Sequence, residues 1–427
     1  MSRAYDIVIF GATGFTGKHT IPQVEKLSKE NGRNYSWAVA GRSESKLLAV
    51  LKEMGDKIGK DLSKTPLIIA DVNDVQSLAN MAMQARIIIN TCGPYKFFGE
   101  PVVKACVENG CHHVDVSGEP FFIENMQLKY HEEAQKKGVY IISACGFDSV
   151  PADLGLMYLR SQFEGTLNSV ETYLTSGVVG GPYPGPSINY GTWESAVHGV
   201  GAFAELKDLR RKLYPTKLPK FNPKLSLRGA VHKCSFNNKY ALPFMGSDRS
   251  VMQRTQRFLY EEEKLRPVQV GTYFCVDSII SILIMAVMGG IFMTLSKFEF
   301  GRNLLLKYPG FFSLGFFSHE GPSDEKMQNT KFAITLIGEG WSTKQDDCNA
   351  DFPTSPDKKV IAQVNGTNPG YGATCMALTL CALTILDDPA KLPKKGGVYS
   401  PGATFHNTSI IKELHKNGLT FEVVEKK

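Results

Sequence analysis

The feature that most constrains the fold is a glycine-rich turn near the start of the chain. A short β-branched run at residues 6–10 ends in Gly11-Ala-Thr-Gly14-Phe-Thr-Gly17, and a periodic stretch follows at residues 18–28. A strand, a glycine turn and a helix are the context that a phosphate-binding loop requires. Gly11 permits the tight turn, Gly14 lets the backbone approach a pyrophosphate, and Gly17 allows the helix to pack against the strand. We therefore predict a dinucleotide site at this helix N-terminus. The spacing G-x-x-G-x-x-G differs from the standard fingerprint, so an ordinary strand-to-helix turn is the alternative.

The elements that follow agree with a nucleotide-binding sheet. Further apolar, β-branched runs recur between stretches that read as helices, two of which cover residues 101–109 and 121–137. The expected strands lie at residues 6–10, 36–42, 66–71, 86–95, 112–119 and 139–145. Six strands that alternate with helices define an α/β domain of the Rossmann type, with a doubly wound parallel sheet.

Residues at the ends of these strands indicate which cofactor binds. Arg42 and Ser43 end the second strand, where NAD-specific folds carry an acid for the ribose 2′-OH and where an arginine accommodates a 2′-phosphate. This favours NADP(H) over NAD(H), although Arg42 is alternatively a solvated loop charge. Asp71 ends the third strand, where it either accepts from the adenine amino group or helps to cap the next helix.

A second glycine turn follows the fourth strand. Such a turn lies at the carboxyl edge of the sheet, near the ribose and nicotinamide, so we expect cofactor contacts from Asn90, Cys92, Gly93, Pro94 and Tyr95.

No catalytic residue can be assigned from the sequence. The candidate proton donors, by residue type alone, are Tyr95, Asp148, Tyr190 and His198. The neighbouring His112 and His113 point to opposite faces of a strand, so we expect no metal site there.

Several motifs together resemble the saccharopine dehydrogenase-like oxidoreductases of the animal lipid-droplet type. They are the Gly11–Gly17 turn, Ala-Gly-Arg42, the Asn90–Tyr95 turn and Cys-Gly-Phe-Asp148-Ser-Val-Pro-Ala-Asp-Leu-Gly. The resemblance runs along the whole chain and implies a Rossmann domain followed by an α+β domain. It implies cofactor contacts from Gly11, Thr13, Gly14, Phe15, Thr16, Gly17 and Arg42. Some bacterial relatives resemble trans-acting enoyl reductases of glycolipid assembly.

The chain departs from the enzymes of lysine metabolism. True saccharopine enzymes carry Gly-x-Asp-Pro-Gly where this chain has Gly146-Phe-Asp148-Ser-Val-Pro151. There is also no counterpart of the arginines that would hold an amino-dicarboxylate. Activity on saccharopine is therefore the least favoured of the functions considered.

The chain has 427 residues, whereas a domain with a single hydrophobic core rarely exceeds roughly 250–300 residues. We expect a Rossmann domain at 1–165, an α+β domain at 166–370 and a segment at 371–427 that packs back on the first domain. Runs at 170–175, 331–337 and 359–364 read as strands without helical crossovers, which predicts a mostly antiparallel second sheet. Residues 177–191 read as a loop and 193–213 as a helix, while an apolar helix at 372–386 and a final helix and strand at 409–417 and 419–424 close the chain.

Residues 278–318 are unusually apolar. Residues 278–295 contain no charge, and a second apolar stretch carries Phe311, Phe312, Phe316 and Phe317. A single membrane crossing would separate strands that belong to one sheet. A buried core helix and an insertion into one leaflet or a droplet surface remain, and we favour insertion. Residues 205–266 hold 15 Lys or Arg and 6 Asp or Glu, a net charge of +9 against +6 for the whole chain, which either attracts an anionic surface or is a solvated face.

These patterns predict an NADP(H)-dependent oxidoreductase that acts on a lipophilic substrate at a lipid droplet or the cytoplasmic face of a membrane, in lipid or glycolipid metabolism. The alternative is an inactive dinucleotide-binding scaffold or redox sensor at the droplet. Nine cysteines without C-x-x-C spacing and the absence of a secretory signal indicate a reducing compartment, with cytosolic domains and no secretion. A homodimer is among the expected partners, and nucleic acid is not.

Overall fold

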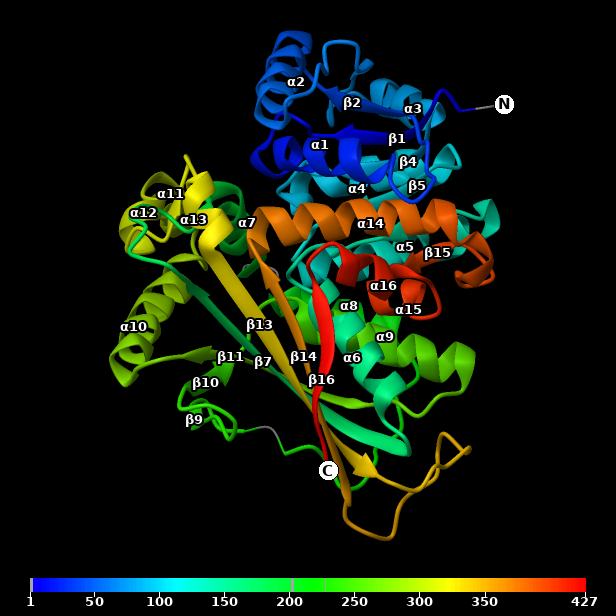
Figure 1. Ribbon diagram of the computed structural model, residues 1–427, viewed down its shortest axis with the longest axis vertical. Coiled ribbons are helices and arrows are strands. Elements are labelled where there is room, and N and C mark those ends of the chain that lie inside the picture. Colours follow the sequence, from blue (N-terminus) through cyan, green and yellow to red (C-terminus); the bar gives the residue numbers. More distant parts are fainter. Residues whose placement is uncertain (1–2, 201–202, 227) are drawn as a thin grey trace.

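The computed structural model describes residues 3–200, 203–226 and 228–427, and these residues form two sheets with helices around them (Figure 1). The first sheet, sheet A, has the strand order β15-β6-β5-β4-β1-β2-β3, and all its neighbouring strands are parallel. Its strands are β1 (Tyr5–Phe10), β2 (Trp37–Gly41), β3 (Leu67–Ile69), β4 (Ala85–Asn90), β5 (His112–Asp115), β6 (Tyr140–Ile142) and β15 (Gly397–Tyr399). The predicted doubly wound parallel sheet is confirmed.

The helices of the first domain connect successive strands. They are α1 (Phe15–Leu27), α2 (Glu44–Ile58), α3 (Val75–Gln84), α4 (Tyr95–Glu108), α5 (Pro120–Lys137) and α6 (Val150–Gln162). Helix α4 begins six residues before the predicted start at residue 101. The reason is a contact from elsewhere in the chain, because the Glu119 carboxylate accepts hydrogen bonds from the backbone N–H groups of Tyr95 and Lys96 at 3.1 and 2.9 Å. This carboxylate replaces the missing cap and favours the helix N-terminus electrostatically.

Sheet A has one more strand than we predicted. β15 contributes three residues, and Val398 pairs with Ile141 of β6 at the edge of the sheet. A run this short carries no periodicity, so the sequence gives no sign of it.

The second sheet, sheet B, is mixed, with the order β16-β14-β13-β7-β11-β10-β9. Only the β7–β11 pair is parallel, so the prediction of a mostly antiparallel sheet is confirmed. Its strands are β7 (Thr166–Val178), β9 (His232–Lys233), β10 (Tyr240–Pro243), β11 (Gln269–Val276), β13 (Thr330–Trp341), β14 (Lys358–Thr367) and β16 (Thr420–Lys426). A small parallel pair joins β8 (Ile188–Asn189) to β12 (Phe317–Ser318). β7 is longer than the predicted strand because β13 pairs with it along its whole length.

The remaining helices lie around the two sheets. They are α7 (Tyr190–Val200), α8 (Phe203–Leu213), α9 (Asp248–Glu263), α10 (Ile279–Leu295), α11 (Glu299–Lys307), α12 (Pro309–Phe312), α13 (Asp324–Asn329), α14 (Thr374–Asp387), α15 (Pro401–Phe405) and α16 (Ile410–Lys416), with the short turns η1 (Pro369–Ala373) and η2 (Pro389–Lys391). The single helix predicted at 193–213 is α7 and α8, and residues 201–202 between them lie outside the described part of the chain.

The C-terminal part of the chain joins the two sheets. Helix α14 packs on α1 and on strands β4 and β5, as predicted, while α6 covers β13 and β14 of sheet B. Residues 371–427 also supply β15 to sheet A and β16 to sheet B. Among the described helices, only Pro369–Asp387 is long and apolar enough to cross a membrane, and it is mostly buried inside the protein. The domain boundaries at 165 and 370 stay predictions.

The apolar segment 278–318 is not a core element. Of the residues in α10, only Ile282 is buried, whereas Ile280 is 70% exposed. The alternative of a buried core helix is therefore wrong. We call α10, α11 and α12 together the apolar foot, and Figure 1 shows it at the left edge of the molecule.

The position of α14 predicts the result of a substitution. Leu380 is fully buried in α14, so Leu380→Ala should lower the free energy of unfolding by about 2–5 kcal/mol. Urea unfolding followed by circular dichroism measures this change. The matched control, Leu48→Ala on the exposed face of α2, should change it by less than about 1 kcal/mol. Equal effects for the two variants would contradict the assignment of α14 as the central core helix.

Candidate functional site

The glycine turn brings α1 unusually close to β1. A Cβ on Gly17 would lie 2.2 Å from the Gly11 carbonyl oxygen and 2.8 Å from the Ala12 Cα. Gly11 itself has a φ of 81°, in the left-handed region that favours glycine. Any side chain at residue 17 would push the helix away from the strand, as the sequence indicates.

The first turn of α1 is left open for a ligand. The N-cap, Gly14, offers no side chain to the free N–H groups of the helix, and Thr13 beside it is exposed. The first N–H groups of a helix lack internal partners and carry partial positive charge, so they suit a phosphate. Thr16 is half-buried, and its backbone carbonyl accepts from the Thr20 hydroxyl at 2.9 Å.

The aromatic ring of Phe15 links this turn to the second domain. It meets the Tyr371 ring edge-on, with the ring centroids 4.6 Å apart, and the Tyr371 oxygen accepts from the Asn189 N–H at 2.8 Å. The turn η1, which carries Tyr371, leads directly into α14. The start of α14 is thus fixed against the predicted phosphate turn.

Arg42 and Ser43 directly follow β2, the position where the sequence predicts contacts with a 2′-phosphate. Arg42 is exposed and has no hydrogen bond or ion pair with any residue in the described ranges. Ser43 is the N-cap of α2, and its hydroxyl accepts from the Lys46 N–H at 3.5 Å. A free guanidinium next to a helix N-terminus supplies the donors that a phosphate ester needs.

Asp71 has a structural role in the described chain. Its Oδ1 accepts hydrogen bonds from the backbone and side-chain nitrogens of Asn73, at 2.9 and 3.1 Å. The cap of α3 is Asp74, which accepts from the N–H groups of Gln76 and Ser77. Of the two alternatives for this stretch, helix capping is therefore observed at Asp74, and the adenine contact of Asp71 stays a prediction.

The second glycine turn is held by its own polar groups. The Asn90 Oδ1 accepts from the Cys92 N–H at 3.0 Å, and the Tyr95 hydroxyl donates to the Asn90 carbonyl at 2.9 Å. Tyr95 is buried, and this burial raises the pKa of its hydroxyl well above the ordinary value. The Tyr95 phenol therefore positions the turn. The backbone of Thr91 and Cys92 lies next to Gly11, where a Cβ would be 3.0 Å from the Cys92 nitrogen, while no contact of Gly93 or Pro94 with Gly11 is observed in the described chain.

Asp148 is the acid at this edge whose side chain faces the solvent. It follows β6, is exposed, and its carboxylate makes no hydrogen bond within the described chain. A Cβ on Gly246 would lie 3.0 Å from Oδ1, and a Cβ on Gly118 would lie 3.5 Å from Oδ2. The backbones of these two glycines therefore lie close to the carboxylate, and a side chain at residue 246 would crowd it.

The backbone around Asp148 is strained and held by hydroxyl groups. Ala144 and Ser149 have φ values of 61° and 155°, which residues with a side chain rarely adopt. The Ser247 hydroxyl donates to the Asp148 carbonyl at 2.9 Å and lies 3.0 Å from the Ser149 hydroxyl. Ser247 and Gly246 were not found by sequence reasoning, because they come from a segment about a hundred residues away with no motif of its own.

The surroundings of Asp148 favour its protonated form. Although Asp148 is accessible at the surface, the protein atoms packed around its carboxylate reduce the hydration of the charged form and raise its pKa to about 6. Burial and repulsion from Asp148 and Asp153 raise the pKa of Asp248, the next residue after Ser247, well above its ordinary value. A carboxyl with a pKa near 6 can both give and take a proton near neutral pH.

The other two candidate donors lie on α7. The Tyr190 ring stacks on His319, with the centroids 3.9 Å apart, and the His198 ring meets Phe97 edge-on at 4.8 Å. Burial and the charge of Lys96 lower the pKa of His198. Neither side chain hydrogen-bonds to Asp148 in the described structure. The described residues also contain no group of three or more His, Cys, Asp or Glu side chains that could hold a metal ion.

Comparison with known proteins identifies the family. Residues 7–142 match the family described as "Saccharopine dehydrogenase NADP binding domain". The human protein "Saccharopine dehydrogenase-like oxidoreductase" is 44% identical over 426 residues, which cover 99% of this chain and 98% of the human one. This chain belongs to the saccharopine dehydrogenase-like oxidoreductases.

Two further proteins extend this comparison. A Caenorhabditis elegans relative named "Lipid droplet localized protein" is 38% identical over 432 residues, covering 99% of each chain. Apo saccharopine dehydrogenase (L-Glu forming) from Saccharomyces cerevisiae has a similar fold, with a TM-score of 0.56 and 16% identity, over 99% of this chain and 100% of that one. Membership of the saccharopine dehydrogenase-like family agrees with the N-terminal fold, and the family of its first domain binds NADP.

The free guanidinium of Arg42 gives a testable prediction. Arg42→Ala should raise the Kd for NADPH tenfold to a hundredfold, because a charge-assisted hydrogen bond is worth about 1.5–3 kcal/mol. The Kd for NADH, which lacks the 2′-phosphate, should stay nearly unchanged. Fluorescence titration with both nucleotides measures this, and Lys46→Ala on the nearby exposed face of α2 is the control. An equal loss for NADPH and NADH would contradict the assignment.

Proposed function

We propose that this protein is an NADP(H)-dependent oxidoreductase that acts on a lipophilic carbonyl or enoyl compound at the surface of a lipid droplet or at the cytoplasmic face of a membrane. The proposal includes a preference for NADP(H) over NAD(H). The observation that carries it is the apolar foot, which is packed on the helix that also reaches the carboxyl edge of sheet A.

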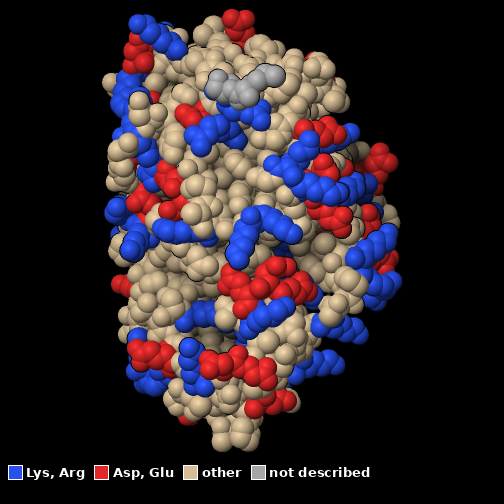
Figure 2. Space-filling model, turned by 90° about the vertical axis from the view of Figure 1, so that its right-hand side faces the viewer, with Lys and Arg blue, Asp and Glu red and all other residues tan. Residues whose placement is uncertain are grey.

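The foot exposes far more apolar surface than a soluble surface helix does. Phe300 and Phe311 are 78% and 75% exposed, and α10 carries no charged residue along its length. A contiguous exposed apolar patch is typical of a protein or membrane contact. The opposite face differs, because Figure 2 shows Lys and Arg interspersed there with Asp and Glu. This asymmetry is what insertion of one side of the molecule into lipid requires.

Helix α7 connects the foot to the candidate site. At one side, the Trp193 indole donates to the Leu305 carbonyl of α11 at 3.0 Å and packs against Phe292 of α10. At the other side, His198 packs against Phe97 of α4, the helix that starts at the second glycine turn. A substrate that enters from lipid along α7 would therefore reach the edge where the cofactor is expected.

The family comparison supports the same location. The C. elegans relative is named for the lipid droplet, and its similarity covers the whole chain, including the foot. The basic stretch at 205–266 contributes less than its net charge suggests. Arg210, Arg228 and Lys239 pair with Glu124, Glu171 and Asp277, all of which lie outside that stretch. The apolar foot is thus the main anchor that we propose.

The site supplies one group for proton transfer. Bound NADPH would supply the hydride, held by the α1 N-terminus and Arg42. Asp148 would give the accompanying proton to the substrate oxygen or carbon and take it back in the reverse direction. The two residues beside its carboxylate are glycines and place no side chain against it, and Ser247 holds its backbone.

An inactive dinucleotide-binding scaffold is the second candidate function. It is favoured by the internal hydrogen bonds of Asn90 and Tyr95, which leave few free polar side chains at this edge. Oxidation of NADPH in the presence of a lipophilic substrate is expected for the oxidoreductase and not for the scaffold.

The foot yields a prediction about location. Replacing Leu283 and Val287, both more than 60% exposed, by Glu should reduce flotation with triolein droplets at least about tenfold. The thermal unfolding midpoint should not change, because neither side chain supports the core. Val75→Glu, an equally exposed position on α3, is the control and should float normally. Normal flotation of the double variant would contradict the proposed anchor.

Asp148 yields a prediction about pH. If it is the acid of the reductive direction, kcat/KM for NADPH-dependent reduction of a droplet-borne enone should fall about tenfold per pH unit above a pKa of about 6. Asp148→Asn should remove this dependence and most of the rate, while Asp56→Asn on α2 should change neither.

The rate of NADPH oxidation at 340 nm measures both variants. If the Asp148→Asn variant still reduced the substrate with the pH profile of the wild-type protein, Asp148 would be excluded as the acid. Tight NADPH binding and droplet association with no turnover on any keto or enoyl lipid would favour the scaffold.

A further inference from the structure

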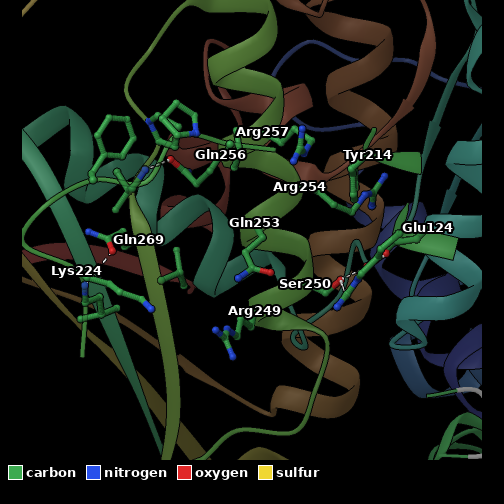
Figure 3. Close-up of a pocket in the computed structure, with 18 of the residues that line it drawn as sticks. Glu124, Tyr214, Lys224, Arg249, Ser250, Gln253, Arg254, Gln256, Arg257 and Gln269 are labelled. Atoms are coloured by element: carbon green, nitrogen blue, oxygen red, sulfur yellow. Dashed lines mark hydrogen bonds and ion pairs between the residues drawn. The ribbon is translucent and has the colours of Figure 1, made fainter. Parts of the chain in front are cut away.

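A cavity lies against α9, and Asp148 is not among the residues that line it. It has a volume of about 770 Å³ and is bounded by α9, the segment after α8, the start of β11 and one residue of α5 (Figure 3). Ser247 and the buried Asp248 begin α9 on the side of sheet A, whereas Arg249 and Gln253 point into this cavity. Pockets of 300–1,000 Å³ commonly bind small molecules.

The cavity carries an excess of positive charge. Its lining includes Arg210, Lys224, Arg249, Arg254 and Arg257, against the single acid Glu124. Glu124 is already saturated, because it accepts hydrogen bonds from Arg210 and from the Ser250 hydroxyl. No acceptor with full negative charge is left in the cavity for the other cations.

Three of these cations have no acidic partner among the described residues. Lys224 and Arg249 are exposed and extend into the space between α9 and β11 in Figure 3. Arg254 is more than nine-tenths buried, and its Nε donates to the Gln127 Oε1 at 2.8 Å. Both Nη groups of Arg254 are buried without a hydrogen bond of ordinary geometry in the described structure, and the Tyr214 hydroxyl, which also lacks such a bond, is their nearest polar neighbour.

A buried donor without an acceptor lowers the stability of the folded protein. Several groups of this kind lie at the cavity, and the nitrogen atoms among them are all hydrogen-bond donors. Besides the two Nη groups of Arg254, the Gln256 Nε2 is buried without a partner, while its Oε1 accepts from the Val268 N–H. A buried donor that lacks an acceptor costs about 1–3 kcal/mol, and more when it is charged. A ligand that only accepts hydrogen bonds, such as a phosphate or a carboxylate, would satisfy these groups.

One part of the wall is apolar. Leu218, Phe221 and Leu225 come from the segment after α8, and Val268 and Val270 come from the start of β11. An inorganic anion alone would leave this surface in contact with water. A ligand that combines an anionic head with an apolar chain matches both parts of the cavity.

We infer that this cavity is a binding site for an amphiphile with a phosphate or carboxylate head. Arg249 and Lys224 bind the head, Arg254 adds positive charge on the side of the cavity near Tyr214, and the apolar part of the wall holds the first part of the chain. The site is distinct from the predicted phosphate turn at Gly11–Gly17, and the inference does not depend on the proposed function.

Calorimetric titration of the full-length protein tests this inference. Monododecyl phosphate below its critical micelle concentration should bind at least tenfold more tightly than the neutral dodecanol. The double variant Lys224→Glu/Arg249→Glu should weaken binding of the phosphate at least about tenfold without changing that of dodecanol. Both residues are exposed and unpaired, so folding should be preserved, and circular dichroism checks this.

Two controls isolate the cavity. Lys217→Glu/Lys220→Glu makes the same change of charge on the same segment outside the cavity and should leave binding unchanged. Arg42→Ala should also leave it unchanged, which separates this site from the cofactor site. Equal affinity for dodecanol, no effect of the Lys224/Arg249 reversal, or no heat with monododecyl phosphate would each overturn the inference.

The source of the head group is a separate arm of the experiment. Vesicles of phosphatidylcholine with 20 mol% phosphatidate are mixed with the wild-type protein and with the Lys224→Glu/Arg249→Glu variant. Binding that is lost in the variant would support the inference with a membrane lipid as the source. Binding of monododecyl phosphate alone would support it with a soluble amphiphile.

Discussion

The close approach of α1 to the end of β1 is the contact on which the rest of the architecture depends. Gly17 has no room for a side chain against the Gly11 carbonyl, and this fit aims the first N–H groups of α1 past the edge of sheet A. Helix α14 packs along α1, and the turn η1 before it places Tyr371 against Phe15. The two sheets are therefore connected through the same helix that forms the predicted phosphate site.

The same arrangement gives the molecule two chemically different sides. The apolar foot is attached through a small buried cluster around Trp193 and Leu305, and most of its own surface remains outside the core. The opposite face carries charges of both signs (Figure 2). Helix α7 contacts both the foot and α4, so it joins the apolar side of the molecule to the helix that begins at the edge of sheet A.

Local patterns predicted the parts of the site that one segment builds by itself. The glycine turn, the arginine that follows β2 and six of the seven strands of sheet A each lie in a run of a few residues, and the sequence predicted them. The parts of the site that form only when distant segments meet in the folded protein were not predicted. The start of α4 depends on Glu119, the environment of Asp148 depends on Gly246 and Ser247, and β15 joins sheet A with three residues. Contacts between distant segments leave no periodic pattern in the sequence. The cavity beside α9 was therefore not predicted, although its cations belong to the basic stretch at 205–266 that the sequence analysis described.

The most direct measurement of the central claim follows the hydride itself. Lipid droplets that carry the protein are incubated with NADPH deuterated at the transferable C4 position, and the extracted lipids are examined by mass spectrometry. We predict deuterium in a discrete lipid species with the wild-type protein, and none with Asp148→Asn. Droplets that bind the protein and NADPH but yield no labelled lipid would contradict an oxidoreductase acting on a lipophilic substrate.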